Sequence, residues 1–163
     1  MEPNFGGLSL HLHPELIPQM QKDIAKQERY DRAYLRMAVE WATLSHCTRK
    51  KVGALLVRDN MIISDGYNGT PSGFPNACED DLGDTHWYVL HAEANAIMKV
   101  ARSTNNAKDS TLYITLSPCK ECCKLILQAG IRRLVYISEY KDTTGLKFLH
   151  SAGVDIVHLE PEQ

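Results

Sequence analysis

The chain of 163 residues is long enough for one domain with a sizeable hydrophobic core. Hydrophobic residues make up 44% of it and charged residues 23%, which is typical of a globular protein. The formal net charge of −2 provides no overall attraction to nucleic acids, and no apolar run reaches the length of a membrane span. We therefore expect neither a nucleic acid nor a membrane as a partner.

The first residues of the chain have no regular pattern. Residues 1–18 contain Gly6-Gly7, two histidines and three prolines, so we expect an irregular arm over 1–18 and a single domain over 19–163. The arm lacks a basic segment followed by an apolar one, so we predict no export signal and a cytoplasmic location. Cysteines stay reduced there, and the five cysteines are expected to be ligands, catalysts or core residues rather than disulfide partners.

Helix and strand signals alternate along the rest of the chain. Apolar residues from Ile24 to Ala42 recur at helical spacing and predict an amphipathic helix over about 19–45. Two β-rich segments flank Asp59-Asn60 and predict antiparallel strands joined by a tight turn. Residues 66–83 are rich in Gly, Pro, Asn and Asp and predict a long loop, a kind of loop that is often functional. Further helices are predicted over 91–102, 119–129 and 143–151, and further strands over 111–116, 134–138 and 154–158. Helices and strands thus alternate along the chain, which is typical of a layered α/β domain.

Two short segments carry the residues expected to bind a metal. Cys119 and Cys122 stand at the start of a predicted helix, where both sulfurs share one turn and the helix N-terminus favours thiolate. His91 raises the number of protein ligands to three, which leaves the fourth position of a tetrahedral zinc ion free for water. Glu93 is predicted to enter the same cavity without binding the metal and to move protons as a general acid–base catalyst.

Each segment alone has a simpler explanation. A lone Cys-x-x-Cys pair is more often a structural zinc knuckle or a redox pair, and a lone His-x-Glu is common without function. The two together, each at a strand-to-helix junction and with Pro118 before the first cysteine, match the pattern of zinc deaminases. A zinc module that binds nucleic acid without catalysis is less favoured, because no fourth protein ligand accompanies Glu93.

Longer motifs extend this pattern to a family. The segments His91–Ile97, Thr115–Cys122 and Gln128–Ile131 resemble the cytidine and deoxycytidylate deaminase superfamily. Val52–Ala54 and Gly66–Gly73 resemble its deoxycytidylate (dCMP) deaminase branch. The resemblance implies a three-layer α/β/α fold with a central mixed five-stranded sheet. It also implies zinc-dependent hydrolysis of dCMP to dUMP and ammonia, which supplies dUMP for thymidylate synthesis. The alternative is a deaminase of the same fold that acts on another base or nucleoside, such as cytidine, guanine or adenosine in RNA.

The same resemblance implies regulation. Family members commonly form homohexamers that are activated by dCTP and inhibited by dTTP, and Mg²⁺ is expected to accompany the triphosphate. The effector sites are expected near the Gly66–Gly73 loop and at subunit contacts. Effector or phosphate candidates in this loop are Gly66, Gly69 and Thr70.

The resemblance also implies a set of substrate-binding residues. Asn68 is expected to hydrogen-bond the deoxyribose, and Tyr140 resembles the family tyrosine near the substrate; Ala92 and Ser117 complete the set. A turn formed by Asn68-Gly69 is the alternative for Asn68. An aromatic side chain packed on a helix is the alternative for Tyr140.

The phosphate of the substrate needs cations or helix N-termini. Lys141 is a candidate because it follows the strand beside the presumed pocket. Arg49, Lys50 and Lys51 form a basic run that is equally compatible with a solvated surface.

The remaining cysteines are assigned less specific roles. Certain family members carry a second, structural zinc. Here the residue types for it are present without a compact spacing, so a second zinc is not favoured; they are His46, Cys47, Cys78 and His86. Cys123 is predicted to face the core as a small apolar residue.

Overall fold

The computed structural model describes residues 13–160 of the chain. The chain divides into two compact units, Met1–Tyr30 and Asp31–Gln163. Helix α1 (Ile17–Ala42), preceded by the 3-10 helix η1 (Pro14–Leu16), contributes residues to both units. Most of the predicted arm, residues 1–12, lies outside the described residues, and its last residues already form η1 and the start of α1.

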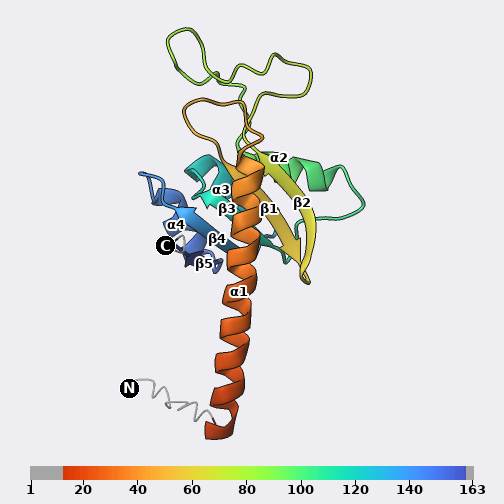
Figure 1. The fold of residues 1–163 in the computed structure, drawn as a ribbon, viewed down its shortest axis with the longest axis vertical. Helices are drawn as coiled ribbons and strands as arrows, with labels where there is room; N and C mark the ends of the chain where they lie inside the picture. The colour runs from red at the N-terminus through yellow and green to blue at the C-terminus, as the bar shows by residue number, and fades with distance from the viewer. Residues whose placement is uncertain (1–12, 161–163) are drawn as a thin grey trace, which may run out of the picture. The chain divides into compact units, whose positions relative to one another are not determined.

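The second unit is built on a five-stranded sheet with the order β2-β1-β3-β4-β5 (Figure 1). Its antiparallel part is β1 (Gly53–Arg58) between β2 (Met61–Tyr67) and β3 (Thr111–Leu116). Its parallel part continues from β3 to β4 (Arg133–Ser138) and β5 (Asp155–His158). The sheet is therefore mixed, as predicted. The β1–β2 turn is formed by Asp59 and Asn60, both with positive φ (52° and 57°), as a tight turn between antiparallel strands requires.

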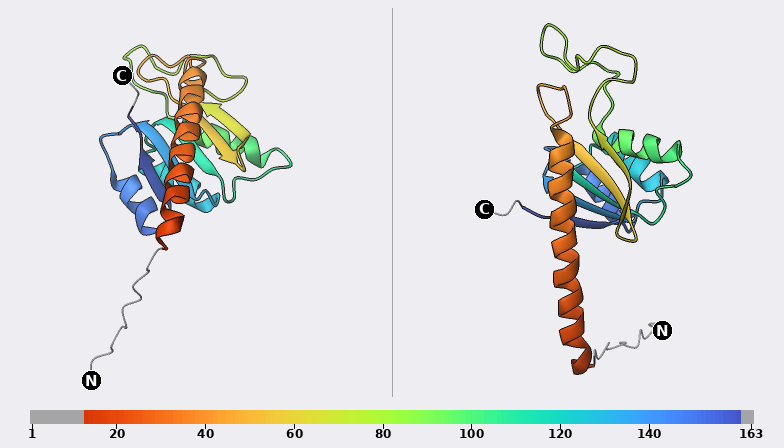
Figure 2. Two further views of the ribbon diagram at one scale, coloured as in Figure 1. Left: turned by 60° about the horizontal axis from the view of Figure 1, so that its bottom comes forward. Right: turned by 45° about the vertical axis from the view of Figure 1, so that its right-hand side comes forward.

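Helices cover both faces of this sheet. Helices α2 (Ala92–Ala101), α3 (Lys120–Gln128) and α4 (Thr144–Ser151) lie on one face, as Figure 2 shows. Along β1, Ala54 and Leu56 pack with these three helices, whereas Leu55 and Val57 pack with Tyr34, Leu35 and Ala38 of α1. This alternation is the two-residue period of a strand that is buried on both faces. The three-layer α/β/α fold is confirmed.

A buried polar network joins α1 to the sheet. The carboxylate of Asp31, which is 2% exposed, accepts hydrogen bonds from the Tyr113 hydroxyl (2.7 Å) and from both terminal nitrogens of Arg133 (2.7 and 2.8 Å). Arg133 also donates to Asp155 at 2.9 Å. Burial, and then the hydrogen bond to Asp31, raise the pKa of Tyr113, and the hydrogen bond to Asp31 raises the pKa of Arg133. The network therefore holds the tyrosine neutral and the arginine charged beneath α1.

One expectation about the cysteines is wrong. Cys47 and Cys78 form a disulfide, with their Cα atoms 5.0 Å apart. The two residues are 31 positions apart in the chain, so no local spacing reveals the pair. The bond connects the segment after α1 to the long loop after β2. Because the disulfide uses both sulfurs, they are not thiolate ligands of a second zinc in this structure.

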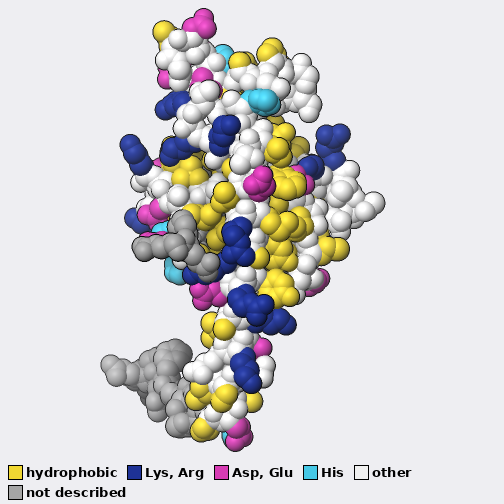
Figure 3. Space-filling model, viewed as in Figure 1, with side chains coloured by type: hydrophobic (Ala, Val, Ile, Leu, Met, Phe, Trp, Pro, Cys, Tyr) yellow, Lys and Arg dark blue, Asp and Glu magenta, His cyan; other side chains and the backbone are white. Residues whose placement is uncertain are grey.

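The edge strand β2 exposes apolar side chains. Met61 is 57% exposed, Ile62 38% and Tyr67 37%, and Figure 3 shows hydrophobic side chains gathered over β1 and β2. Within residues 13–160, no helix combines the length and the apolar character needed to cross a bilayer.

Candidate active site

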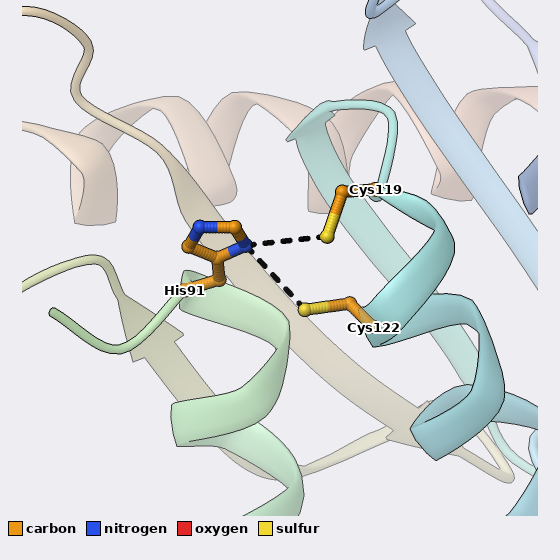
Figure 4. A group of neighbouring side chains, drawn as sticks. All are labelled: His91, Cys119 and Cys122. Atoms are coloured by element: carbon orange, nitrogen blue, oxygen red, sulfur yellow. Dashed lines mark hydrogen bonds between the residues drawn. The ribbon is translucent and has the colours of Figure 1, made fainter. Parts of the chain in front are cut away.

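The three predicted metal ligands come together at the N-termini of two helices (Figure 4). His91 is the extended residue just before α2, and Cys119 is the extended residue just before α3. Cys122 lies in the first turn of α3. Each helix therefore begins at its ligand, and the ligand spacing Cys-x-x-Cys places both sulfurs on the same side of one turn.

The ligand distances fit zinc. The His91 Nδ1 atom lies 3.6 Å from Cys119 Sγ and 3.5 Å from Cys122 Sγ, and all three ligand atoms lie within 4.8 Å of one another. A tetrahedral zinc ion with Zn–N and Zn–S bonds of about 2.0 and 2.3 Å places such atoms about 3.5 Å apart. Hydrogen bonds from Cys122 and His91 lower the pKa of the Cys119 thiol to about 3, whereas the hydrogen bond to Cys119 and burial raise the pKa of Cys122, so Cys119 is the thiolate of the pair.

Glu93 is buried beside this ligand set. It belongs to the first turn of α2 and is 3% exposed, and burial raises the pKa of its carboxyl group. Among the described residues, the side chains close enough together to bind one metal ion are His91, Cys119 and Cys122, and Glu93 is not one of them. A shielded carboxylate that is not a ligand can accept and return a proton, as the sequence predicts.

A cavity of about 530 Å³ opens over the ligands. Its volume lies in the usual range for small-molecule sites. Most of the residues predicted to form the site lie in its wall; they are Arg49, Lys50, Asn68, His91, Ala92, Glu93, Ser117, Cys119 and Tyr140. The structure therefore brings together segments that are far apart in the chain.

Besides the ligand Cys122 and Lys51, four predicted residues are not among those lining this cavity. Lys141 is exposed, although its neighbour Tyr140 lines the cavity. Gly69 and Thr70 are half-buried in the loop after β2. Gly66 belongs to β2 and is buried, and a Cβ atom there would lie 2.3 Å from the carbonyl oxygen of Ala92. Close packing of β2 against α2 thus accounts for this glycine.

Asn68 and Ser117 brace the walls of the cavity. The Asn68 side chain accepts a hydrogen bond from the Val52 N–H (2.8 Å) and donates one to the Lys50 carbonyl (2.8 Å). The Ser117 hydroxyl accepts the Tyr140 N–H at 2.8 Å. These contacts fix the backbone of the segments that carry Lys50 and Tyr140, whose ammonium and ring lie 5.7 Å apart.

No pattern in the sequence indicates the role of Glu79. Its carboxylate accepts the backbone N–H groups of Thr48 (3.0 and 3.1 Å) and Arg49 (3.1 Å), and these hydrogen bonds, that of Arg49 first, lower its pKa. Together with the nearby disulfide, Glu79 attaches the long loop to the segment that carries Arg49 and Lys50. Glu79 and the N–H groups of Thr48 and Arg49 come together only when the long loop is folded, because Glu79 is about 30 positions away in the chain.

Comparisons with known proteins agree with this geometry. The family described as the cytidine and deoxycytidylate deaminase zinc-binding region matches residues 28–138. The deoxycytidylate deaminase of Mus musculus is 37% identical over 146 residues, a match that covers 79% of this chain and 79% of the mouse protein. The deoxycytidylate deaminase of Saccharomyces cerevisiae is 31% identical over 154 residues, which are 87% of this chain and 49% of the yeast protein. This chain thus spans about half the length of the yeast relative.

A solved structure supports the same relationship. The crystal structure of dCMP deaminase from the cyanophage S-TIM5, in complex with dCMP and dUMP, superposes with a TM-score of 0.76 at 39% identity. The match covers 91% of this chain and 100% of the cyanophage chain. In both fold and zinc-binding segments, therefore, the chain belongs to the cytidine and deoxycytidylate deaminase family.

Proposed function

We propose that the protein hydrolyses dCMP to dUMP and ammonia. The observation that carries this proposal is the buried carboxylate of Glu93 beside a three-ligand zinc set, in a cavity large enough for a nucleotide. The similarity to a cyanophage enzyme crystallised with dCMP and dUMP supports this choice among the substrates of the fold.

The reaction requires a group that carries protons beside the nucleotide base. His91, Cys119 and Cys122 would hold the zinc ion, which would supply a water activated for attack at neutral pH. A C–O bond forms and the C–N bond to the amino group breaks, with no net oxidation or reduction. Glu93 accepts one proton of the attacking water and passes it to the ring nitrogen, and then carries the proton of the new hydroxyl group to the amino group, which leaves as ammonia.

Other wall residues are proposed to orient the nucleotide. Ala92 is the first residue of α2, where a backbone N–H has no partner within the helix and is available to the base. Tyr140 and Ser117 line the wall beside Lys50. Asn68 also lines the cavity, and we propose that it acts on the deoxyribose while it holds the Lys50–Val52 segment in place.

Arg49 and Lys50 are the proposed phosphate ligands. They are the lysine and arginine residues that line the cavity within the described part of the chain, and Lys141 is not among the lining residues. A phosphate held by a cationic side chain makes charge-assisted hydrogen bonds, each worth about 1.5–3 kcal/mol. The phosphate is therefore the part of the substrate that this loop segment selects.

An absorbance assay for loss of the amino group from dCMP, CMP, deoxycytidine and AMP tests the proposed substrate. We expect the highest kcat/KM for dCMP and a lower value for deoxycytidine, which lacks the phosphate. Equal kcat/KM for dCMP and deoxycytidine would contradict the proposal. Turnover of AMP without turnover of dCMP would show that the enzyme deaminates adenine rather than cytosine.

Two lysine variants test the phosphate contact. Lys50→Ala is expected to lower kcat/KM for dCMP by about 10- to 100-fold, the loss of one charge-assisted bond, and to leave the slow reaction on deoxycytidine nearly unchanged. Lys141→Ala is the matched comparison, because it removes the same charge from outside the cavity wall. A selective loss on dCMP in the Lys141 variant, with none in the Lys50 variant, would place the phosphate at Lys141.

Regulation and assembly complete the proposal. We propose a cytoplasmic homo-oligomer, a hexamer on the family pattern, that responds to dCTP and dTTP with Mg²⁺. The exposed apolar side chains of the edge strand β2 support a subunit contact, because clustered apolar surface is typical of interfaces. Light scattering and rate measurements with each triphosphate test assembly and control separately.

A further inference from the structure

Cys123 follows the ligand Cys122 on α3 but does not belong to the metal cluster. It is 0% exposed. Its thiol donates to the carbonyl oxygen of Pro118 at 3.8 Å, and its backbone N–H donates to the carbonyl oxygen of Cys119 at 3.0 Å. Cys123 therefore contacts the backbone on both sides of the turn that presents the first sulfur ligand.

Cys123 also meets Gly145 in the first turn of α4. A Cβ atom at residue 145 would lie 2.6 Å from Cys123 Sγ, 3.1 Å from Lys120 Cα and 3.2 Å from Lys120 N. Glycine is unfavourable inside a helix, so its presence here is explained by packing rather than by helix propensity. Helix α4 approaches the first turn of α3 this closely only because residue 145 has no side chain.

We propose that the Gly145–Cys123 contact is a positioning device for the metal centre. It fixes the turn Pro118–Cys122 against α4 and so sets the separation of the two sulfur ligands from His91, which lies just before α2. A closely packed interior transmits the displacement caused by even one added methyl group. The proposal rests on the zinc site of the proposed function and does not depend on which nucleotide is the substrate.

A size-exchange experiment tests this contact. Gly145→Ala is expected to lower zinc affinity by about 10- to 100-fold, the usual effect of disturbing the groups that hold metal ligands. Adding Cys123→Ala removes the sulfur atom that the new methyl group meets, so the double variant should recover most of the affinity. Zinc affinity is measured by competition with a chromophoric chelator, and the Co²⁺-substituted protein reports ligand geometry through its visible spectrum.

Two further variants separate positioning from loss of stability. Leu149→Val truncates a fully buried side chain one turn further along α4 and is expected to lower stability to urea without changing zinc affinity. Cys123→Val adds bulk to the contact from the α3 side and should weaken zinc binding. Normal affinity and an unchanged Co²⁺ spectrum in Gly145→Ala would overturn the proposal, as would a double variant no better than Gly145→Ala.

The experiment also remains decisive if Gly145→Ala fails to fold. The double variant must then restore both folding and zinc binding, and Cys123→Val must weaken zinc affinity in its folded form; failure of either refutes the positioning role. Because zinc is measured without nucleotide, inactivity on dCMP would count against the proposed function alone.

Discussion

Glu93→Gln isolates proton transfer from metal binding. Glutamine has the shape of glutamate but cannot accept the proton of the attacking water. General acid–base catalysis contributes about 10²–10⁴-fold to a rate, or about 2.7–5.4 kcal/mol of barrier. We expect a loss near the upper end, because within residues 13–160 no second carboxylate in the cavity wall is free to substitute. The other acidic residue of that wall is Glu79, which already accepts N–H groups of Thr48 and Arg49.

The assay compares kcat with metal content. Turnover of dCMP is followed by absorbance, and zinc is measured in the same preparation. Glu93→Gln should keep its zinc, because Glu93 is not part of the ligand cluster. Glu79→Gln is the matched control: it loosens the segment that carries Arg49 and Lys50, so it should raise KM more than it lowers kcat.

Two results would refute this reasoning about Glu93. Loss of zinc in Glu93→Gln would make Glu93 a ligand, contrary to the geometry. A kcat that stays within about tenfold of the unchanged protein would mean that another group carries the proton.

Three more predictions concern the ligands, the buried network and the disulfide. Cys119→Ser should lower zinc content and abolish turnover; full zinc occupancy with activity would remove Cys119 from the metal site. Asp31→Ala should cost about 3–5 kcal/mol in urea unfolding, because it leaves a partly buried arginine without its main partner, and a cost below about 1 kcal/mol would show that Arg133 finds water instead. Reduction of Cys47–Cys78 should lower the free energy of unfolding by about 3–4 kcal/mol for a loop of this length, whereas unchanged stability would mean that the bond does not form in solution.

The clustering of His91, Cys119 and Cys122 could be predicted because its signals are local. The Cys-x-x-Cys spacing fits one helical turn, and His91 stands immediately before a second helix. The strands could be predicted equally well. The Asp59-Asn60 turn and the apolar run 111–116 are each recognisable from a few neighbouring residues. Only the ends differed, since β2 continues to Tyr67 through residues that were expected to open the long loop.

The contacts that join distant segments were not predictable. Nothing in the sequence near Asp31 indicates Arg133, which is 102 residues away. Lys141 is a phosphate candidate in the sequence because it follows the strand beside the presumed pocket, but in the structure it is exposed and does not line the cavity. The exposed position of Lys141 and the place of Lys50 in the cavity wall depend on how the loop segments fold back over the sheet.

The site divides its two tasks between different kinds of structure. Zinc binding and proton transfer rest on residues at the starts of α2 and α3, which are fixed by the packing of helices on the sheet. Contact with the phosphate is proposed for the Arg49–Lys50 segment, which is held by Asn68, by Glu79 and by a disulfide to the long loop. Changes in these loops should therefore alter KM and the choice of nucleotide while zinc affinity stays constant. Changes at the helix starts should reduce zinc affinity and kcat for every substrate. A folded loop variant that loses zinc would contradict this division. It would show that the phosphate-binding loops and the zinc-binding helix starts are coupled.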